Sequence, residues 1–202
     1  MRSAVRERIE RAPEGTWFRP SELGGGNSVE QLLSRLARDP QAPIVRAAKG
    51  LYFKCGKPDQ FFGKRAPSPV EIAMQVARGQ GVGPAGPAAA AFLGLTTQVA
   101  PRPALTVVGT PPAGVDGVRW EVRKNPLRAQ LNYAEVAVVE MLSLFPYGAE
   151  ADWDEVVRRI EALQAKRTID LDRISKVVAN ERRKPELRRN FDRLTADVSL
   201  AA

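Results

Sequence analysis

Residues 27–53 constrain the fold of this chain more than any other stretch, because an amphipathic helix is followed there by a short basic hairpin. Four aliphatic side chains recur at i, i+3, i+4 and i+7 and so share one helical face: Val29, Leu32, Leu33 and Leu36. Asn27 is predicted to cap this helix together with Glu30, and Asp39-Pro40 to end it. The pattern therefore predicts a helix over residues 28–38 with one buried and one polar face.

The polar face carries side chains that suit the edges of base pairs. Arginine can bind guanine through two hydrogen bonds, and glutamine can bind adenine in the same way. The predicted DNA-binding residues of the helix are Asn27, Ser28, Gln31, Ser34, Arg35 and Arg38. The alternative is an ordinary amphipathic helix with a solvated polar face.

The hairpin that follows resembles the wing of a DNA-binding domain. Ile44–Arg46 and Leu51–Phe53 are predicted to be two short strands, with residues 47–50 turning between them. Arg46 and Lys49 put positive charge near the tip, where we expect them to contact phosphate groups.

The residues before the helix complete a recognisable order. Ala4–Ala12 is predicted to be a first helix, Thr16–Phe18 a short strand and Pro20–Leu23 a short second helix, followed by the turn Gly24–Gly26. Helix, strand, helix, turn, helix and hairpin is the order of a winged helix-turn-helix. The predicted fold class is α+β, with an N-terminal winged helix-turn-helix and a C-terminal α+β domain that ends in a helical tail.

The second half is predicted to begin after a linker at residues 54–67, which gives a DNA-binding domain at 1–66 and a partner or effector domain at 67–202. Ser68 and Glu71 form a capping box for a helix that runs to about residue 78. Two apolar runs, 104–108 and 118–122, are predicted to be strands that form a hairpin or a sheet pair. Further helices are predicted at 86–93, at 133–144, at 153–164, at 171–180 and from Pro185, with the helical tail starting at about residue 151.

Charge is unevenly distributed along the chain. Residues 1–66 hold 13 Lys or Arg and 7 Asp or Glu, a net of +6, whereas residues 67–150 hold 6 of each. Residues 151–202 hold 12 and 10, a net of +2, and their densest run is 180–193. A basic domain joined to a near-neutral one favours a nucleic-acid module plus a second function, although RNA and acidic proteins also fit. The mixed run 180–193 could contact DNA phosphates or an acidic partner, but a solvated face is the preferred interpretation.

Several classes of chemistry lack their usual residues. The chain has no His and one Cys, which excludes His general bases, His metal ligands and cysteine-cluster metal sites. There is no GxxxxGK[ST] loop, and the glycine-rich run 79–86 lacks the preceding strand of a dinucleotide-binding motif. We therefore predict no catalytic residues, no cofactor and no metal. No stretch is apolar enough to span a membrane, and the N-terminus lacks a signal-peptide pattern, so a cytoplasmic protein is expected.

Residues 83–110, GPAGPAAAAFLGLTTQVAPRPALTVVGT, resemble the bacterial AbiEi-type antitoxins of type IV toxin–antitoxin systems. The matching positions are Pro84 with Gly86, the run from Leu93 to Val99, and Leu105 to Gly109. Gly50-Leu51-Tyr52 also resembles the end of the wing in this family, and the resemblance covers about residues 1–145.

This resemblance implies an autorepressor that binds operator DNA and counteracts a nucleotidyltransferase-like toxin. Whether neutralisation requires direct contact with the toxin stays open, and self-association on inverted-repeat DNA is compatible with such a regulator. The alternative hypotheses are a winged-helix transcriptional regulator without a toxin partner, and an accessory subunit of an enzyme such as a nuclease.

Overall fold

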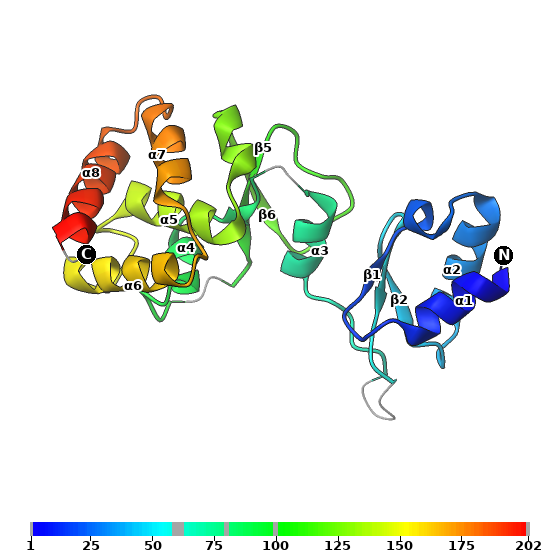
Figure 1. The fold of residues 1–202 in the computed structure, drawn as a ribbon. Coiled ribbons are helices and arrows are strands. Elements are labelled where there is room, and N and C mark those ends of the chain that lie inside the picture. The colour runs from blue at the N-terminus through cyan, green and yellow to red at the C-terminus, as the bar shows by residue number, and fades with distance from the viewer. Residues whose placement is uncertain (1, 58–62, 79–80, 99–100, 201–202) are drawn as a thin grey trace. The chain divides into compact units, whose positions relative to one another are not determined.

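The computed structural model describes the whole chain except residues 1, 58–62, 79–80, 99–100 and 201–202 (Figure 1). The chain is a mixed α+β protein, as the sequence predicted. It divides into two compact units: unit 1 is Met1–Val76 with Gly114–Asp116, and unit 2 is Ala77–Ala113 with Gly117–Ala202.

Unit 1 contains a three-stranded antiparallel sheet and four helical segments. In chain order its elements are α1 (Arg2–Arg11), β1 (Trp17–Phe18), the 3-10 helix η1 (Pro20–Leu23), α2 (Asn27–Arg38), β2 (Ile44–Ala48), β3 (Leu51–Lys54) and α3 (Pro69–Val76). The strand order is β1-β3-β2. The elements predicted up to residue 54 are all present, within two residues at each boundary.

Strand pairing decides which side chains of unit 1 are buried with the helices. Phe18 pairs with Tyr52 across β1 and β3, and Trp17 pairs with Phe53. Because side chains alternate across a strand, the two pairs lie on opposite faces of the sheet. Phe18 and Tyr52 join the apolar sides of α1 and α2 in one core, with Val5, Ile9, Leu23, Val29, Leu32, Leu33, Leu36 and Ile44.

Unit 2 consists of a small sheet and several helices. Its elements are β4 (Gly83–Pro84), α4 (Pro87–Phe92), β5 (Ala104–Val108), β6 (Arg119–Arg123), the 3-10 helix η2 (Pro126–Gln130), α5 (Tyr133–Leu144), α6 (Trp153–Ala165), α7 (Leu171–Ala179) and α8 (Pro185–Leu200). The strand order is β4-β5-β6, with β4 antiparallel to β5.

The sheet pair predicted at 104–108 and 118–122 is present, but its strands are parallel, so the hairpin alternative was wrong. A hairpin turn reverses the chain, whereas a parallel neighbour requires the chain to return to the start of the first strand. Residues 109–118 are long enough for this return, because ten extended residues span about 33 Å and a five-residue strand only about 17 Å.

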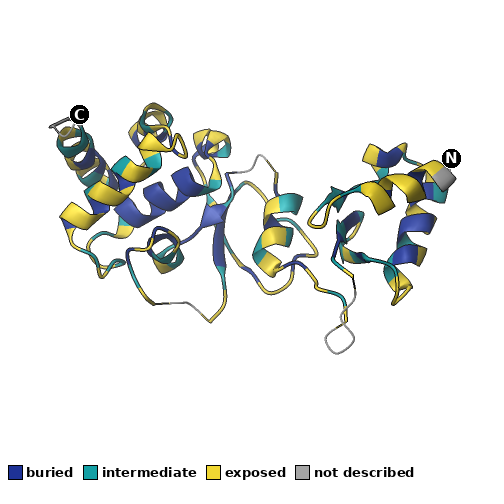
Figure 2. Cartoon of the chain, turned by 60° about the horizontal axis from the view of Figure 1, so that its bottom comes forward, coloured by how far each residue is buried: buried dark blue, intermediate teal, exposed yellow. Residues whose placement is uncertain are grey.

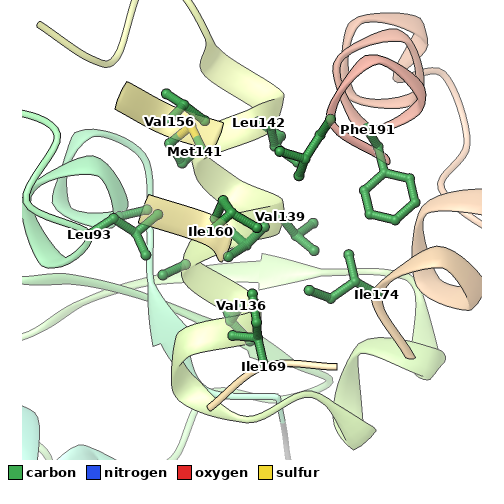
Figure 3. Close-up of a cluster of buried hydrophobic side chains, with 14 of the residues drawn as sticks. Leu93, Val136, Val139, Met141, Leu142, Val156, Ile160, Ile169, Ile174 and Phe191 are labelled. Atoms are coloured by element: carbon green, nitrogen blue, oxygen red, sulfur yellow. The ribbon is translucent and has the colours of Figure 1, made fainter. Parts of the chain in front are cut away.

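Helix α5 forms the centre of unit 2 and packs against β4, α4, α7 and α8. Its residues 134–142 are all buried, so this part of the helix has no solvent-facing side, and the helix is dark blue over most of its length in Figure 2. Val136, Val139, Met141 and Leu142 of α5 pack with side chains from α4, α6, α7 and α8 (Figure 3).

The glycine-rich run before β4 is explained by close packing. A Cβ atom on Gly81 would lie 2.2 Å from the carbonyl oxygen of Arg128, and one on Gly83 would lie 2.4 Å from Cβ of Val136. These glycines let the backbone approach η2 and α5 where any side chain would collide.

Ser68 and Glu71 form the expected capping box of α3, with the Glu71 carboxylate accepting from the Ser68 amide at 2.8 Å. The predicted linker at 54–67 includes residues 58–62, which lie outside the described part. None of the described helices is both long enough and apolar enough to cross a membrane.

Candidate nucleic-acid interface

Helix α2 is held by its apolar face, which fixes the direction of its polar face. Val29, Leu32, Leu33 and Leu36 are each at most 8% exposed. The six predicted DNA-binding side chains lie on the other side of the helix. Four of them are exposed: Asn27, Gln31, Arg35 and Arg38. The other two, Ser28 and Ser34, are half-buried. The helix therefore presents amide and guanidinium groups outward along its whole length.

The predicted capping of α2 by Asn27 and Glu30 was wrong. The helix begins at Asn27, and Gly26 occupies the N-cap position without any side-chain cap. Gly24, Gly25 and Gly26 all have positive φ, of 96°, 67° and 83°. Only glycine adopts this conformation at low cost, so the glycine run, rather than a capping side chain, sets where the helix starts. Asn27 is consequently not used as a cap.

The predicted wing is a hairpin with a tighter turn than expected. Strands β2 and β3 pair from Ile44↔Lys54 to Ala48↔Leu51, with an irregularity between Arg46 and Ala48. Lys49 and Gly50 form the turn, and Gly50 has φ 68°. Arg46 and Lys49 are both exposed, Arg46 at the irregularity and Lys49 at the tip.

The cations of α2 and the wing differ from those of α1 in their pairing. On α1, Arg6 pairs with Glu10 at 3.3 Å and Arg11 pairs with Glu7 at 2.6 Å. By contrast, four exposed cations make no ion pair or side-chain hydrogen bond with any described residue: Arg35, Arg38, Arg46 and Lys49. Their positive charge is available to a ligand.

Tyr52 shows that the helix and the wing share one electrostatic environment. Burial raises the pKa of the Tyr52 hydroxyl, while the positive charges of Arg46 on β2 and Arg38 on α2 lower that pKa in part. Helix α2 also packs against β2, the first strand of the wing. The C-terminal part of α2 and the base of the wing are therefore neighbours.

Two lysines outside the predicted site support these elements. Nζ of Lys54, which is 7% exposed, donates to the carbonyls of Ile9, Glu10 and Ala12 at 2.8, 2.6 and 2.6 Å, and so caps the C-terminus of α1. Nζ of Lys64 donates to the carbonyls of Asp39 and Ile44, where α2 ends and β2 begins. Cations stabilise helix C-termini in this way. No local pattern in the sequence indicates either role, because the lysines are far along the chain from the carbonyls.

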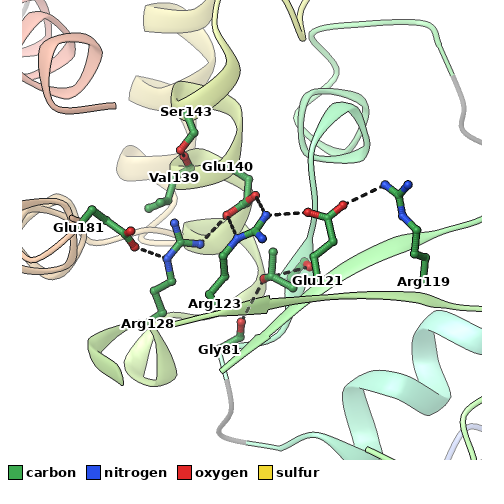
Figure 4. Close-up of polar contacts among 11 residues, drawn as sticks. Gly81, Arg119, Glu121, Arg123, Arg128, Val139, Glu140, Ser143 and Glu181 are labelled. Carbon is green, nitrogen blue, oxygen red and sulfur yellow. Dashed lines mark hydrogen bonds and ion pairs between the residues drawn. The ribbon is translucent and has the colours of Figure 1, made fainter. Parts of the chain in front are cut away.

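In unit 2, several charged side chains are buried and form ion pairs with one another. Arg128, which is 1% exposed, pairs with Glu140 of α5 and Glu181, and Arg123 of β6 pairs with Glu140 and Glu121 (Figure 4). Burial alone would raise the pKa of Glu140, but its hydrogen bond with Arg123 and the charges of Arg128 and Arg123 lower it to about 2. These charges join β6, η2, α5 and the end of α7 inside the unit. Glu135, which is fully buried, is likewise paired with Arg173 at 3.0 Å.

The Thr96-Thr97-Gln98 segment has a specific partner. Glu150 accepts from the amide and hydroxyl of Thr97, at 2.8 and 3.0 Å, and from Nε2 of Gln98 at 3.1 Å. Thr97 and Gln98 thus bind a carboxylate just before α6, and the interaction joins two loops of unit 2.

Comparison with known proteins adds little to these observations. No family model and no curated protein matches the chain. Among solved structures, the chain is similar to the RV2827C protein from Mycobacterium tuberculosis, with 15% sequence identity and a TM-score of 0.47, over 95% of this chain and 74% of that one. A similarity at this level supports no statement about function, which has to be inferred from the residues themselves.

Proposed function

We propose that this chain is an antitoxin that binds its own operator DNA through unit 1 and counteracts a nucleotidyltransferase-like toxin. In this proposal the chain acts by binding and requires no cofactor. The DNA-binding part is argued from the structure of unit 1, and the toxin-directed part from the resemblance centred on residues 83–110.

The topology of unit 1 supports DNA binding. Helix, strand, short second helix, third helix and hairpin, with a sheet in the order β1-β3-β2, is the order of elements on which we base the proposal of a winged helix. In such a domain the helix before the hairpin enters the major groove, and here that helix is α2. The hairpin turn at Lys49 and Gly50 then corresponds to the wing.

The observation that carries the proposal is the set of exposed cations on α2 and the wing that have no partner among the described residues. An arginine at a protein surface is often paired with an acid, as Arg6 and Arg11 are on α1. Arg35 and Arg38 are instead exposed beside Gln31 on the outward face of α2. Guanidinium and amide groups in this arrangement suit base edges, and Arg46 and Lys49 suit phosphates.

The toxin-directed role is assigned to unit 2. The residues that carry the family resemblance form β4, α4, the Thr97–Glu150 interaction and β5. Unit 2 has its own core around α5, which does not depend on the DNA-binding surface. A regulator without a toxin partner remains the second candidate, because the exposed cations of unit 1 support DNA binding in either case.

The two candidates are separated by expressing the full chain together with the product of the adjacent gene and measuring growth. An antitoxin restores growth. A regulator that is not an antitoxin represses the promoter but does not restore growth. The Arg35→Ala/Arg38→Ala variant, with the toxin under an unrelated promoter, should lose repression and retain rescue. Failure of the wild-type chain to retard its own promoter DNA would overturn the DNA-binding part of the proposal.

A further inference from the structure

A cavity of about 460 Å³ lies in unit 1, and two aromatic side chains, Trp17 and Phe53, form part of its lining. Their ring centroids are 4.9 Å apart, and both side chains are half-buried. Strand pairing directs them to the face of the sheet opposite Phe18 and Tyr52, which pack with α1 and α2. Aromatic rings that line a cavity of this size offer a stacking surface to a flat ligand.

Four charged residues line the same cavity, and two of them are already engaged. The Lys54 ammonium group donates to three carbonyls at the end of α1. The Glu71 carboxylate accepts from the amide and the hydroxyl of Ser68, at 2.8 and 2.7 Å. The other two, Glu14 and Arg65, are exposed, and their side chains make no ion pair or hydrogen bond with any residue that the structure describes. The cavity therefore offers one free carboxylate and one free guanidinium group to a ligand.

The free carboxylate and the free guanidinium group lie at different parts of the cavity. A Cβ atom on Gly56 would lie 3.0 Å from Oε2 of Glu14, so this carboxylate stands beside the residues that follow β3. Hydrogen bonds with Ser68 lower the pKa of Glu71, and the charge of Arg65 lowers it further, which places Arg65 near the first turn of α3. A ligand that binds both groups must therefore carry its anionic group away from the atoms that bind Glu14.

The carboxylate of Glu14 selects among flat ligands. An ionised carboxylate has acceptors only, so its two oxygens are best satisfied by two adjacent N–H groups. Among the nucleobases, guanine carries such a pair, N1–H and the N2 amino group, whereas adenine has one donor beside an acceptor nitrogen. Arg65 favours an anion, and phosphate suits the planar guanidinium group. An aromatic amino acid fits less well, because its ammonium and carboxylate groups share one carbon atom.

We propose that this cavity binds a free guanine nucleotide. The base stacks on the aromatic pair of Trp17 and Phe53, its N1–H and N2 amino group donate to Glu14, and the phosphate binds Arg65. The cavity lies on the face of the sheet opposite the core formed with α2, so it is separate from the DNA-binding surface. The inference goes beyond the proposed function and requires neither operator DNA nor a toxin.

The test measures the binding of GMP, AMP and guanosine to the full chain by isothermal titration calorimetry. GMP and AMP carry the same phosphate and differ in the base, whereas guanosine keeps the base and lacks the phosphate. A ligand that leaves a hydrogen-bonding group of its site unpaired binds less tightly, so we expect GMP to bind about tenfold more tightly than AMP or guanosine, or better. The proposal is overturned if GMP does not bind at millimolar concentration, or if AMP or guanosine binds equally well.

Variants locate the binding site. Glu14→Gln should abolish the preference for GMP over AMP, because an amide no longer offers two acceptor oxygens. Arg65→Gln should lower the affinity for GMP to that for guanosine and leave guanosine binding unchanged. Glu155→Gln and Lys57→Gln make the same charge changes at exposed positions outside the cavity lining and should behave like the wild-type chain. If the two cavity variants bind the three ligands as their controls do, the proposal is overturned.

Discussion

The outward face of α2 and the buried charges around Arg128 use the same amino acid for opposite purposes. Arg35 and Arg38 are exposed and bind no described residue, whereas Arg128 is 1% exposed and holds Glu140 and Glu181 together. Burying an unpaired charge costs several kcal/mol, so an arginine inside a protein requires acceptors. On the surface, water solvates the guanidinium and leaves it available to a ligand.

This difference predicts which arginine substitutions change the stability of the protein and which change its affinity for DNA. Substitution of a buried, paired arginine should change the free energy of unfolding, and substitution of an exposed, unpaired one should change affinity alone.

The largest effect is expected for Arg128→Met. The substitution leaves Glu140 and Glu181 buried with fewer partners, and breaking a buried pair costs about 3–5 kcal/mol. Urea unfolding monitored by circular dichroism measures the loss. Arg158→Met, at an exposed position of α6, is the matched control and should change stability by less than about 0.5 kcal/mol. Equal stability of the two variants would show that the buried ion pairs do not stabilise unit 2.

A related prediction concerns the dependence of the free energy of unfolding on pH. The pKa of Glu140 is lowered to about 2, so the folded state holds this carboxylate ionised at pH values where the unfolded chain protonates it. Its contribution to stability is therefore complete above the unfolded pKa of about 4.3 and is lost as the pH falls towards 2. Unfolding free energies between pH 6 and 2.5 should fall less steeply for Glu140→Gln than for the wild-type chain. Identical slopes would contradict the assignment.

A smaller loss of stability is expected in unit 1 from Lys54→Met. The substitution removes three charge-assisted hydrogen bonds to the end of α1, and hydrogen bonds to charged groups contribute about 1.5–3 kcal/mol. Lys57→Met, at an exposed position nearby, is the control. If both variants unfold at the same urea concentration, Lys54 does not act as a cap.

The smallest effect is expected for the wing. If Arg46 and Lys49 contact phosphates, each alanine substitution should flatten the dependence of log affinity on log salt by about 0.9, for specific and non-specific DNA alike. Fluorescence anisotropy over a range of salt concentrations measures this slope, with Lys124→Ala in unit 2 as the control. Loss of discrimination at one operator position with an unchanged slope would mean that the wing contacts bases.

The helices and strands of the chain were largely predictable from local patterns. The spacing of Val29, Leu32, Leu33 and Leu36 predicted α2 and its buried face, and the continuous apolar run at 133–144 predicted the central helix α5. Such patterns are local, because periodicity and capping depend on residues within a few positions of one another. The N-cap of α2 was predicted wrongly, as Asn27 instead of Gly26, because three glycines with positive φ replace a capping side chain.

Interactions between distant residues could not be predicted in the same way. The parallel pairing of β5 and β6 depends on the path of residues 109–118, which no local signal specifies. Lys54 and Lys64 each bind carbonyls at least 20 positions away, and Arg128 binds Glu181 from 53 positions away. In the candidate interface, the sequence predicted which residues of α2 face outward. It did not predict that the cations there pair with no residue in the described part of the chain.

The measurement that tests the central claim most directly compares two double variants in binding to the chain's own promoter DNA. Arg35→Ala/Arg38→Ala and Arg6→Ala/Arg11→Ala remove the same charge, the first from the unpaired face of α2 and the second from the paired arginines of α1. Each lost contact from α2 should cost about 1–3 kcal/mol of binding free energy, while the α1 variant binds nearly as well as the wild-type chain. Equal weakening by both variants, or full binding by the folded α2 variant, would contradict the assignment of α2 as the DNA-binding helix.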